Sequence, residues 1–214
     1  MAEQPIAKKE ANNDTVEIQG ISTEELHNYI KTAVNKVAPH LNKDEKKEHA
    51  KLLVKIFEQG MIPKKAMNIS DEELAQIYSF AYHHFGSGKY REAREMFKMM
   101  LMLDPINTDF ATSLGICHHR LKDYEYALTC YMLGAFLEPT NPVCLFYAYD
   151  CYVNLKNDTC AAVMLGNVIA RAGDQAPYAH IKNDAQIRLD ALLKKIAEGP
   201  AEKEESTLTR DIPS

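Results

Sequence analysis

Residues 86–89 (Gly-Ser-Gly-Lys) have the glycines and the lysine of a loop that could bind phosphate. Such a loop needs Ser or Thr directly after its lysine and a strand in front of its first glycine. Here Tyr90 follows Lys89, and the preceding residues 82–85 (Tyr-His-His-Phe) belong to a helical pattern. The segment is therefore predicted to be a turn between two helices rather than a nucleotide site.

Residues 117–119 (Cys-His-His) could form a thiolate–imidazole pair or contribute ligands to a metal ion. Neighbouring residues of a helix point in different directions, and no third or fourth ligand follows at a spacing typical of metal sites. Residues 83–84 (His-His) are excluded by the same argument. No nucleophile, base and orienting residue can be assembled into one set. We therefore expect no catalytic residue, no metal site and no cofactor, and the protein is predicted not to be an enzyme.

The charge and composition exclude several other classes of protein. The 214 residues carry a formal net charge of −5, so no basic surface is predicted for nucleic acid or anionic membranes. The longest uncharged stretches, residues 126–137 and 139–149, fall short of the ~20 residues that a membrane span needs. The five cysteines form no Cys-x-x-Cys pair, and the first residues show no export signal. We expect a cytoplasmic protein with reduced cysteines, no nucleic-acid partner and no direct membrane insertion.

A repeat of 34 residues organises the helices that would position any site. Three pairs of similar residues lie 34 positions apart: Pro105 and Pro139, Ala93 and Ala127, and Phe97 and Tyr131. This period is typical of tetratricopeptide repeats, in which each unit consists of two antiparallel helices. No alternating strand pattern of useful length occurs. The predicted fold class is therefore all-α, a tetratricopeptide helical-repeat superhelix.

The register of the repeat gives three units, residues 74–107, 108–141 and 142–175. A small residue is expected where the two helices of each unit cross, and Ala93, Ala127 and Ala161 occupy that position. One turn later a large residue should fill the gap, as Phe97, Tyr131 and Leu165 do. The third unit is degenerate, because Gly173 stands where the closing proline is expected.

Helical segments flank the three repeats on both sides. The predicted domains are a disordered N-terminus (1–21), an N-terminal helical region (22–70), three repeats (71–175), a C-terminal capping helix (176–198) and a disordered tail (199–214). The first helix should begin at Ser22 or Thr23 and end before Pro39. A second helix at residues 43–59 carries an apolar side made by Leu52, Leu53, Ile56 and Phe57. That side either caps the repeat stack or forms a homodimer interface, and the sequence leaves both open.

The first helix of each repeat should line a concave groove. In the first repeat, Leu74, Ile77, Ala81 and His84 form the packing stripe, and a second stripe of aromatic residues lies about 100° around the helix. An aromatic stripe is often core, but the repeat register already assigns the core face, so we predict a binding groove. Its residues in the three repeats are Tyr78, Tyr82 and Phe85, then Thr112, Ile116 and His119, then Phe146, Asp150 and Val153. Such a groove suits an extended peptide with hydrophobic anchors.

Several stretches of the sequence resemble one family. They are residues 58–70, 77–82 (Ile-Tyr-Ser-Phe-Ala-Tyr), 88–97, 113–117 (Ser-Leu-Gly-Ile-Cys), 126–131, 134–135 and 146–151. Between about residues 45 and 197 the chain resembles the class II chaperones of bacterial type III secretion, the SycD/LcrH/IpgC-like tetratricopeptide family. Residues 1–42 lie outside this resemblance.

The resemblance implies an ATP-independent chaperone of the bacterial cytosol that keeps hydrophobic translocator proteins soluble, unassembled and ready for secretion. The family binds a Pro-x-Leu-x-x-Pro-like segment of the translocator in its concave groove, and the aromatic residues used there match Tyr78, Tyr82 and Phe85. Members commonly dimerise through the N-terminal helical region, which here includes residues 43–59.

The alternative is a generic tetratricopeptide adaptor for protein–protein interaction. One such adaptor docks the acidic C-terminus of a heat-shock chaperone, which requires Lys, Arg and Asn at set groove positions. This sequence instead has Tyr78, Tyr82, Ser113, Val143 and Tyr147 at those positions. The carboxylate clamp is therefore predicted to be absent.

Overall fold

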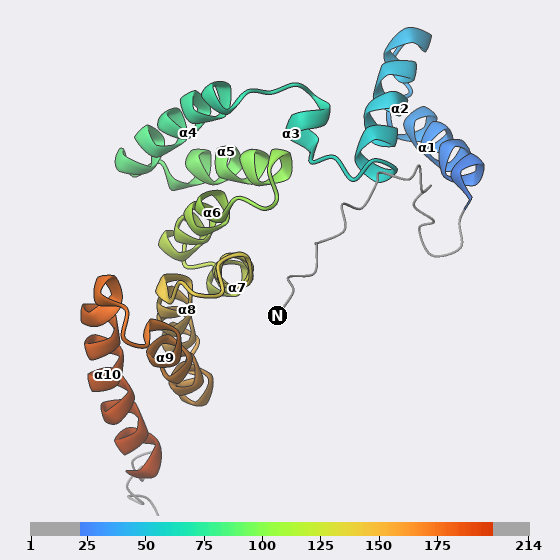
Figure 1. Cartoon of the computed structure of the whole chain (residues 1–214). Coiled ribbons are helices and arrows are strands. Elements are labelled where there is room, and N and C mark those ends of the chain that lie inside the picture. Colours follow the sequence, from blue (N-terminus) through green and yellow to red (C-terminus); the bar gives the residue numbers. More distant parts are fainter. Residues whose placement is uncertain (1–21, 199–214) are drawn as a thin grey trace, which may run out of the picture. The chain divides into compact units, whose positions relative to one another are not determined.

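The computed structural model describes residues 22–198, in which every regular element is a helix (Figure 1). The elements are α1 (Thr23–Val37), α2 (Lys43–Phe57), α3 (Pro63–Ala66), α4 (Asp71–Gly86), α5 (Tyr90–Leu103), α6 (Thr108–Arg120), α7 (Tyr124–Leu137), α8 (Val143–Asn154), α9 (Asp158–Ala172), the 3-10 helix Ala176–Tyr178 and α10 (Ala179–Glu198). The all-α prediction is confirmed. The segments predicted to be disordered, 1–21 and 199–214, lie outside the described residues. Among the helices described, none combines the length and the apolar character that crossing a membrane requires.

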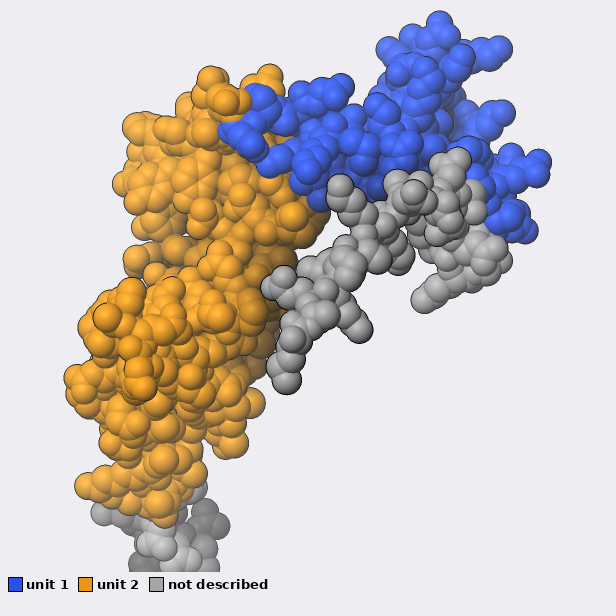
Figure 2. Space-filling model, in the orientation of Figure 1, with its two compact units in different colours: residues 1–71 blue, residues 72–214 orange. Residues whose placement is uncertain are grey.

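The chain divides into two compact units, residues 1–71 and residues 72–214 (Figure 2). In the first unit, α1 and α2 both begin with a capping box. Ser22 and Glu25 exchange hydrogen bonds at the start of α1, and Asn42 and Glu45 do so at the start of α2. These boxes satisfy backbone N–H groups that the first helical turn leaves without partners. Both helices therefore begin where local sequence chemistry favours a helix.

The second unit is a stack of helical hairpins followed by α10 (Figure 1). Each hairpin turn passes through a residue with positive φ, namely Gly88 (74°), Lys122 (65°) and Lys156 (57°). These three residues are themselves 34 positions apart. At each turn a backbone N–H donates back over the last helical turn, as Asp123 does to the carbonyl oxygen of His118 (2.9 Å). The same turn therefore closes the first helix of all three repeats, including the degenerate third.

The helix crossings follow the predicted register. Ala93, Ala127 and Ala161 are fully buried, with 0% of their surface exposed. The large residues one turn later, Phe97, Tyr131 and Leu165, are at most 1% exposed. The four positions of the second and third repeats belong to one buried cluster, and Ala93 and Phe97 repeat the same small-then-large pattern in the first repeat.

Two glycines allow helices to approach still more closely. A Cβ atom added at Gly115 in α6 would lie 2.7 Å from Cε1 of the Tyr131 ring on α7. One added at Gly134 in α7 would lie 2.7 Å from Sγ of Cys144 on α8. Non-bonded carbon atoms prefer separations of ~3.5–4.0 Å, so either side chain would push two helices apart. By contrast, a Cβ atom at Gly166 in α9 would meet nothing within 4 Å.

We expect Gly115→Ala to destabilise the protein by ~1–3 kcal/mol, because the new methyl group collides with a ring that has no room to move. Gly166→Ala is the matched control and should stabilise it by up to ~1 kcal/mol, since alanine favours helix and the site is open. Urea unfolding followed by circular dichroism measures both changes. Equal stability of the two variants would show that α6 and α7 are not in close contact at Gly115.

Candidate functional site

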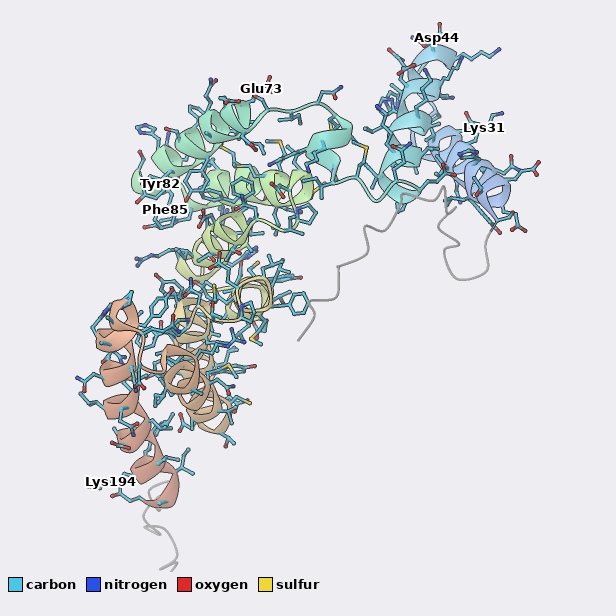
Figure 3. The ribbon with its side chains drawn as sticks, in the orientation of Figure 1. Lys31, Asp44, Glu73, Tyr82, Phe85 and Lys194 are labelled. Atoms are coloured by element: carbon cyan, nitrogen blue, oxygen red, sulfur yellow. The ribbon has the colours of Figure 1, made fainter. Side chains whose placement is uncertain are left out.

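Three aromatic side chains form a ladder along α4. The ring of Tyr82 stacks on that of Tyr78, with centroids 6.4 Å apart and an interplanar angle of 15°. It also stacks on Phe85, at 6.2 Å and 29°. Figure 3 shows Tyr82 and Phe85 next to each other at the end of α4. Tyr82 remains 60% exposed, so the middle of the ladder presents an aromatic face to solvent.

The ladder is supported from the core at both ends. The Phe85 ring packs edge-on against Tyr90 at the start of α5, at 5.2 Å. The Tyr78 ring packs edge-on against the buried Phe97 at 5.5 Å and lies 6.0 Å from Phe110 on α6. Such contacts hold Tyr82 between two fixed neighbours.

The prediction that all three aromatics lie apart from the core is wrong for Tyr78. Its ring is half-buried against Phe97, and its hydroxyl lies 3.3 Å from the Oγ atom of Ser113 on α6. Tyr78 follows the packing residue Leu74 by one helical turn, and its long side chain reaches the junction of α4, α5 and α6. Tyr78 therefore packs against the core and also forms one end of the ladder.

In the second repeat the predicted residues lie on α6 and are all half-buried. Oγ1 of Thr112 lies 3.3 Å from Sγ of Cys144, and Ile116 packs against the core around Tyr131. Nε2 of His119 lies 3.1 Å from a carboxylate oxygen of Asp150 on α8. The structure thus brings together His119 and Asp150, which the sequence assigned to neighbouring repeats of one groove.

In the third repeat, Asp150 and Val153 are partly exposed, but α10 lies over Phe146. The guanidinium carbon of Arg188 lies 5.5 Å from the centre of the Phe146 ring and 5.8 Å from that of Tyr149. The Nε–H group of Arg188 donates to Asp184 at 2.9 Å, which holds the guanidinium in place. This cation–π contact forms the border of the predicted groove at its C-terminal end. The sequence predicted a capping helix at residues 176–198 but not the contact that Arg188 makes.

The three side chains of the Cys-His-His segment on α6 point in different directions, as expected for neighbouring residues of a helix. Cys117 is fully buried, whereas His118 approaches Asp123 at 3.5 Å and His119 points to Asp150. Burial lowers the pKa of His118 below its ordinary value, although the contact with Asp123 acts in the opposite direction. Within residues 22–198, no three His, Cys, Asp or Glu side chains gather closely enough to hold a metal ion.

Burial also suppresses the reactivity of most cysteines. It raises the pKa of Cys117 and Cys151 to about 12, that of Cys130 to about 11, and that of Cys144 above its ordinary value. At pH 8 a thiol of pKa 12 is ionised to roughly one part in ten thousand, and the thiolate is the reactive form. Cys160, on α9, is the partly exposed cysteine.

We expect maleimide at pH 8 to modify Cys160 rapidly in the folded protein and to leave the four buried cysteines unmodified. Denaturant should make all five react, because unfolding removes the burial that keeps the thiols protonated. Mass spectrometry of labelled peptides measures each site, and Cys160→Ser should abolish the rapid phase. Rapid native labelling of Cys117 would contradict the packing of α6 described above.

The sequence and the fold of this chain are similar to those of several known proteins. No family model matches the sequence. The low calcium response locus protein H of Yersinia pestis is 29% identical over 130 residues, which cover 59% of this chain and 76% of the relative. The crystal structure of PcrH in complex with the chaperone binding region of PopD shares 27% identity at a TM-score of 0.56, covering 59% of this chain and 95% of that one. The Yersinia enterocolitica chaperone SycD in complex with a peptide of the translocator YopD shares 26% identity at a TM-score of 0.57, covering 60% and 98%. The likeness thus spans more than half of this chain and nearly all of both solved structures.

Proposed function

Because the chain resembles the class II chaperones of type III secretion in sequence and in fold, we propose that it is itself such a chaperone. It binds hydrophobic translocator proteins in the bacterial cytosol and keeps them soluble, unassembled and competent for secretion. Binding requires no ATP and no cofactor, and the protein catalyses no reaction. An extended Pro-x-Leu-x-x-Pro-like segment of the translocator occupies the groove of α4, α6 and α8.

The observation that carries this proposal is the exposed ring of Tyr82 between Tyr78 and Phe85. Aromatic rings offer a large contact area with few rotatable bonds, so little conformational entropy is lost when a client covers them. The exposed faces of these rings suit contact with the apolar side chains of proline and leucine. The solved complexes of PcrH with a region of PopD and of SycD with a YopD peptide support this use of the fold.

Polar groups along the groove are suited to the backbone of an extended client. An extended peptide exposes N–H and C=O groups that must find partners once they leave water. The Tyr82 hydroxyl can donate to a client carbonyl, and the Asp150 carboxylate beside His119 can accept from a client N–H. The groove therefore combines apolar anchoring with a small number of orienting hydrogen bonds.

The alternative, an adaptor for acidic C-termini, has no matching cations on this surface. Its clamp positions hold Tyr78, Tyr82, Ser113, Val143 and Tyr147, and the Tyr78 hydroxyl is directed to Ser113. Arg188 does border the groove, but Asp184 already compensates its charge. A client with two carboxylates would lose its hydration without gaining an ion pair, so this function is disfavoured.

We expect Tyr82→Ala to weaken binding of a translocator Pro-x-Leu-x-x-Pro peptide by ~2 kcal/mol, roughly thirtyfold, because it removes the central ring of the ladder. Its melting temperature should stay unchanged, since the side chain is mostly exposed. Calorimetric titration and circular dichroism measure the two effects.

Tyr126→Ala is the matched control. Tyr126 is 69% exposed on α7, the second helix of its repeat, and its loss should leave peptide binding unchanged. Normal binding by Tyr82→Ala together with weak binding by Tyr126→Ala would place the client on the second helices instead.

We also propose that the protein forms a homodimer through the apolar side of α2. No residue of α2 is fully buried in the single chain, and Phe57 is 51% exposed. The residues Leu52, Leu53 and Ile56 are only half-buried. A second copy covering this side would remove these apolar groups from water.

Phe57→Glu should shift the protein toward monomer, because it places a charge in the proposed interface. Sedimentation velocity of the full chain measures the change. Tyr29→Glu is the control, since Tyr29 is a similarly exposed aromatic residue on α1. A wild-type protein that is already monomeric at high concentration would show that the apolar side of α2 is no dimer interface.

A further inference from the structure

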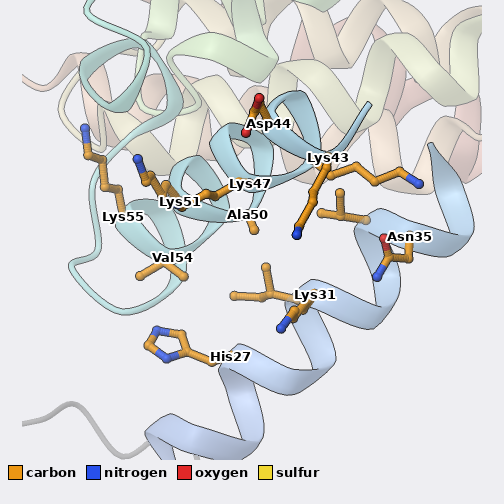
Figure 4. A pocket seen from close by; sticks show the side chains of 13 residues that line it. His27, Lys31, Asn35, Lys43, Asp44, Lys47, Ala50, Lys51, Val54 and Lys55 are labelled. Carbon is orange, nitrogen blue, oxygen red and sulfur yellow. The ribbon is translucent and has the colours of Figure 1, made fainter. Parts of the chain in front are cut away.

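The first unit contains a pocket that the proposed groove does not involve. It lies between α1 and α2 and has a volume of about 1190 Å³ (Figure 4). Apolar side chains from both helices line it: Ile30 and Val34 from α1, and Ala50 and Val54 from α2. Ile30 and Val34 are buried, so the apolar part of the pocket is recessed between the helices.

Lysines dominate the charge around this apolar floor. Six of them line the pocket, together with a single acidic residue, Asp44: Lys31, Lys43, Lys46, Lys47, Lys51 and Lys55. Among the residues that the structure describes, Lys51 is the one lysine of the six with an ion pair, to Glu48 at 2.7 Å. For the other five, no described residue places a carboxylate within ion-pair distance, although Glu48 also attracts Lys47 and Lys55 from farther away. The pocket therefore combines an apolar floor with a rim of mostly uncompensated positive charge.

We propose that this pocket binds an acidic amphipathic helix of a partner protein. The lining runs from His27 to Asn35 on α1 and from Lys43 to Lys55 on α2, which is about 13 Å and about 19 Å of helix. Two packed helices leave one long apolar side open, and a third helix laid along it completes a three-helix bundle. Apolar residues at helical spacing on the partner would pack against the half-buried Ala50 and Val54 and extend side chains toward Ile30 and Val34. Glu and Asp on its flanks would pair with the lysines of the rim.

The charge argues against a second copy of this chain as the occupant. A two-fold symmetric contact places the same surface on both sides of the interface, so six lysines would face six lysines. Such like-charge opposition costs several kcal/mol. The pocket is thus distinct from the apolar side of α2 that we assign to dimerisation.

The shape argues against a membrane surface. A helix that binds a bilayer presents its apolar residues outward, so that they can enter the lipid headgroup region. Here Ile30 and Val34 are buried between the helices, where single side chains projecting from a partner helix can reach them and a flat bilayer cannot. A helix with an apolar stripe and acidic flanks fits both the shape and the charge.

The test measures fluorescence anisotropy of a labelled helical peptide of about 15 residues, the length of α1 and α2, with the full chain. The peptide has leucines at helical spacing and glutamates on both flanks. We expect saturable binding that weakens as salt rises, since exposed ion pairs are screened. Lys31→Glu combined with Lys47→Glu should weaken binding by about tenfold or more, because both charges then repel the peptide. Lys98→Glu combined with Lys194→Glu makes the same charge change outside the pocket and should have little effect.

Control peptides separate this site from general attraction and from the groove. A peptide of identical composition with a scrambled order should bind poorly, because it keeps the charge but loses the apolar stripe. A Pro-x-Leu-x-x-Pro peptide should neither displace the acidic helix nor bind differently to the Lys31/Lys47 variant. This inference is therefore independent of the proposed chaperone function, and either can fail without the other.

Several outcomes would overturn the proposal. Equal weakening by both double variants, or equal binding of the scrambled peptide, would show that net charge alone attracts the ligand. The helical peptide could fail to bind while the wild-type protein binds phosphatidylglycerol vesicles and the Lys31/Lys47 variant does not. That result would assign the pocket to membranes. Much tighter peptide binding after removal of residues 199–214 would make the chain's own tail the occupant. A change of sedimentation in the Lys31/Lys47 variant would make the pocket an interface between copies.

Discussion

Close approach of the helices in the second unit depends on small residues at the points where they cross. Ala93, Ala127 and Ala161 leave no exposed surface, and Gly115 lies directly against the ring of Tyr131. The Tyr131 hydroxyl is buried and has no hydrogen-bond partner among the described residues, which costs ~1–3 kcal/mol. Burial also raises its pKa, so the hydroxyl stays neutral. The role of Tyr131 is therefore to fill, with its ring, the space that Gly115 leaves open.

The same crossings decide which side of each first helix remains available for binding. In α4, Leu74 and Ala81 face the neighbouring helices and are buried, so Tyr82 is left on the open side. Tyr78 lies between these two directions, and its contacts with Phe97 and Ser113 fix the base of the ladder. Under the proposed function, a ladder supported in this way needs little ordering of its own when a client binds.

The 34-residue period predicted the crossings and the hairpins, because packing repeats wherever the helices repeat. The groove residues that the same register predicts belong to the proposed function. The period did not predict the left-handed turns at Lys122 and Lys156. Glycine occupies the equivalent position 88 in the first repeat, but lysine rarely adopts positive φ and so gives no sign of such a turn. Arg188 was missed because its contact with Phe146 depends on how α10 packs, which no local pattern encodes. The lysine-lined pocket was missed for a similar reason, since a charged helix start resembles an ordinary solvated surface until a second helix faces it.

The two surfaces differ in the physical basis of recognition. Polar groups along the proposed groove already have partners within the protein, since His119 lies 3.1 Å from Asp150 and Arg188 pairs with Asp184, so the proposed binding there depends on aromatic contact and shape. In the pocket of the first unit most lysines form no ion pair with a described residue, so the proposed binding there depends on charge and should fall as salt screens it. With the functions proposed above, an apolar and weakly charged segment would therefore select the groove, and an acidic helix would select the pocket. Because each surface disfavours the ligand of the other, one chain can hold two partners without competition between them.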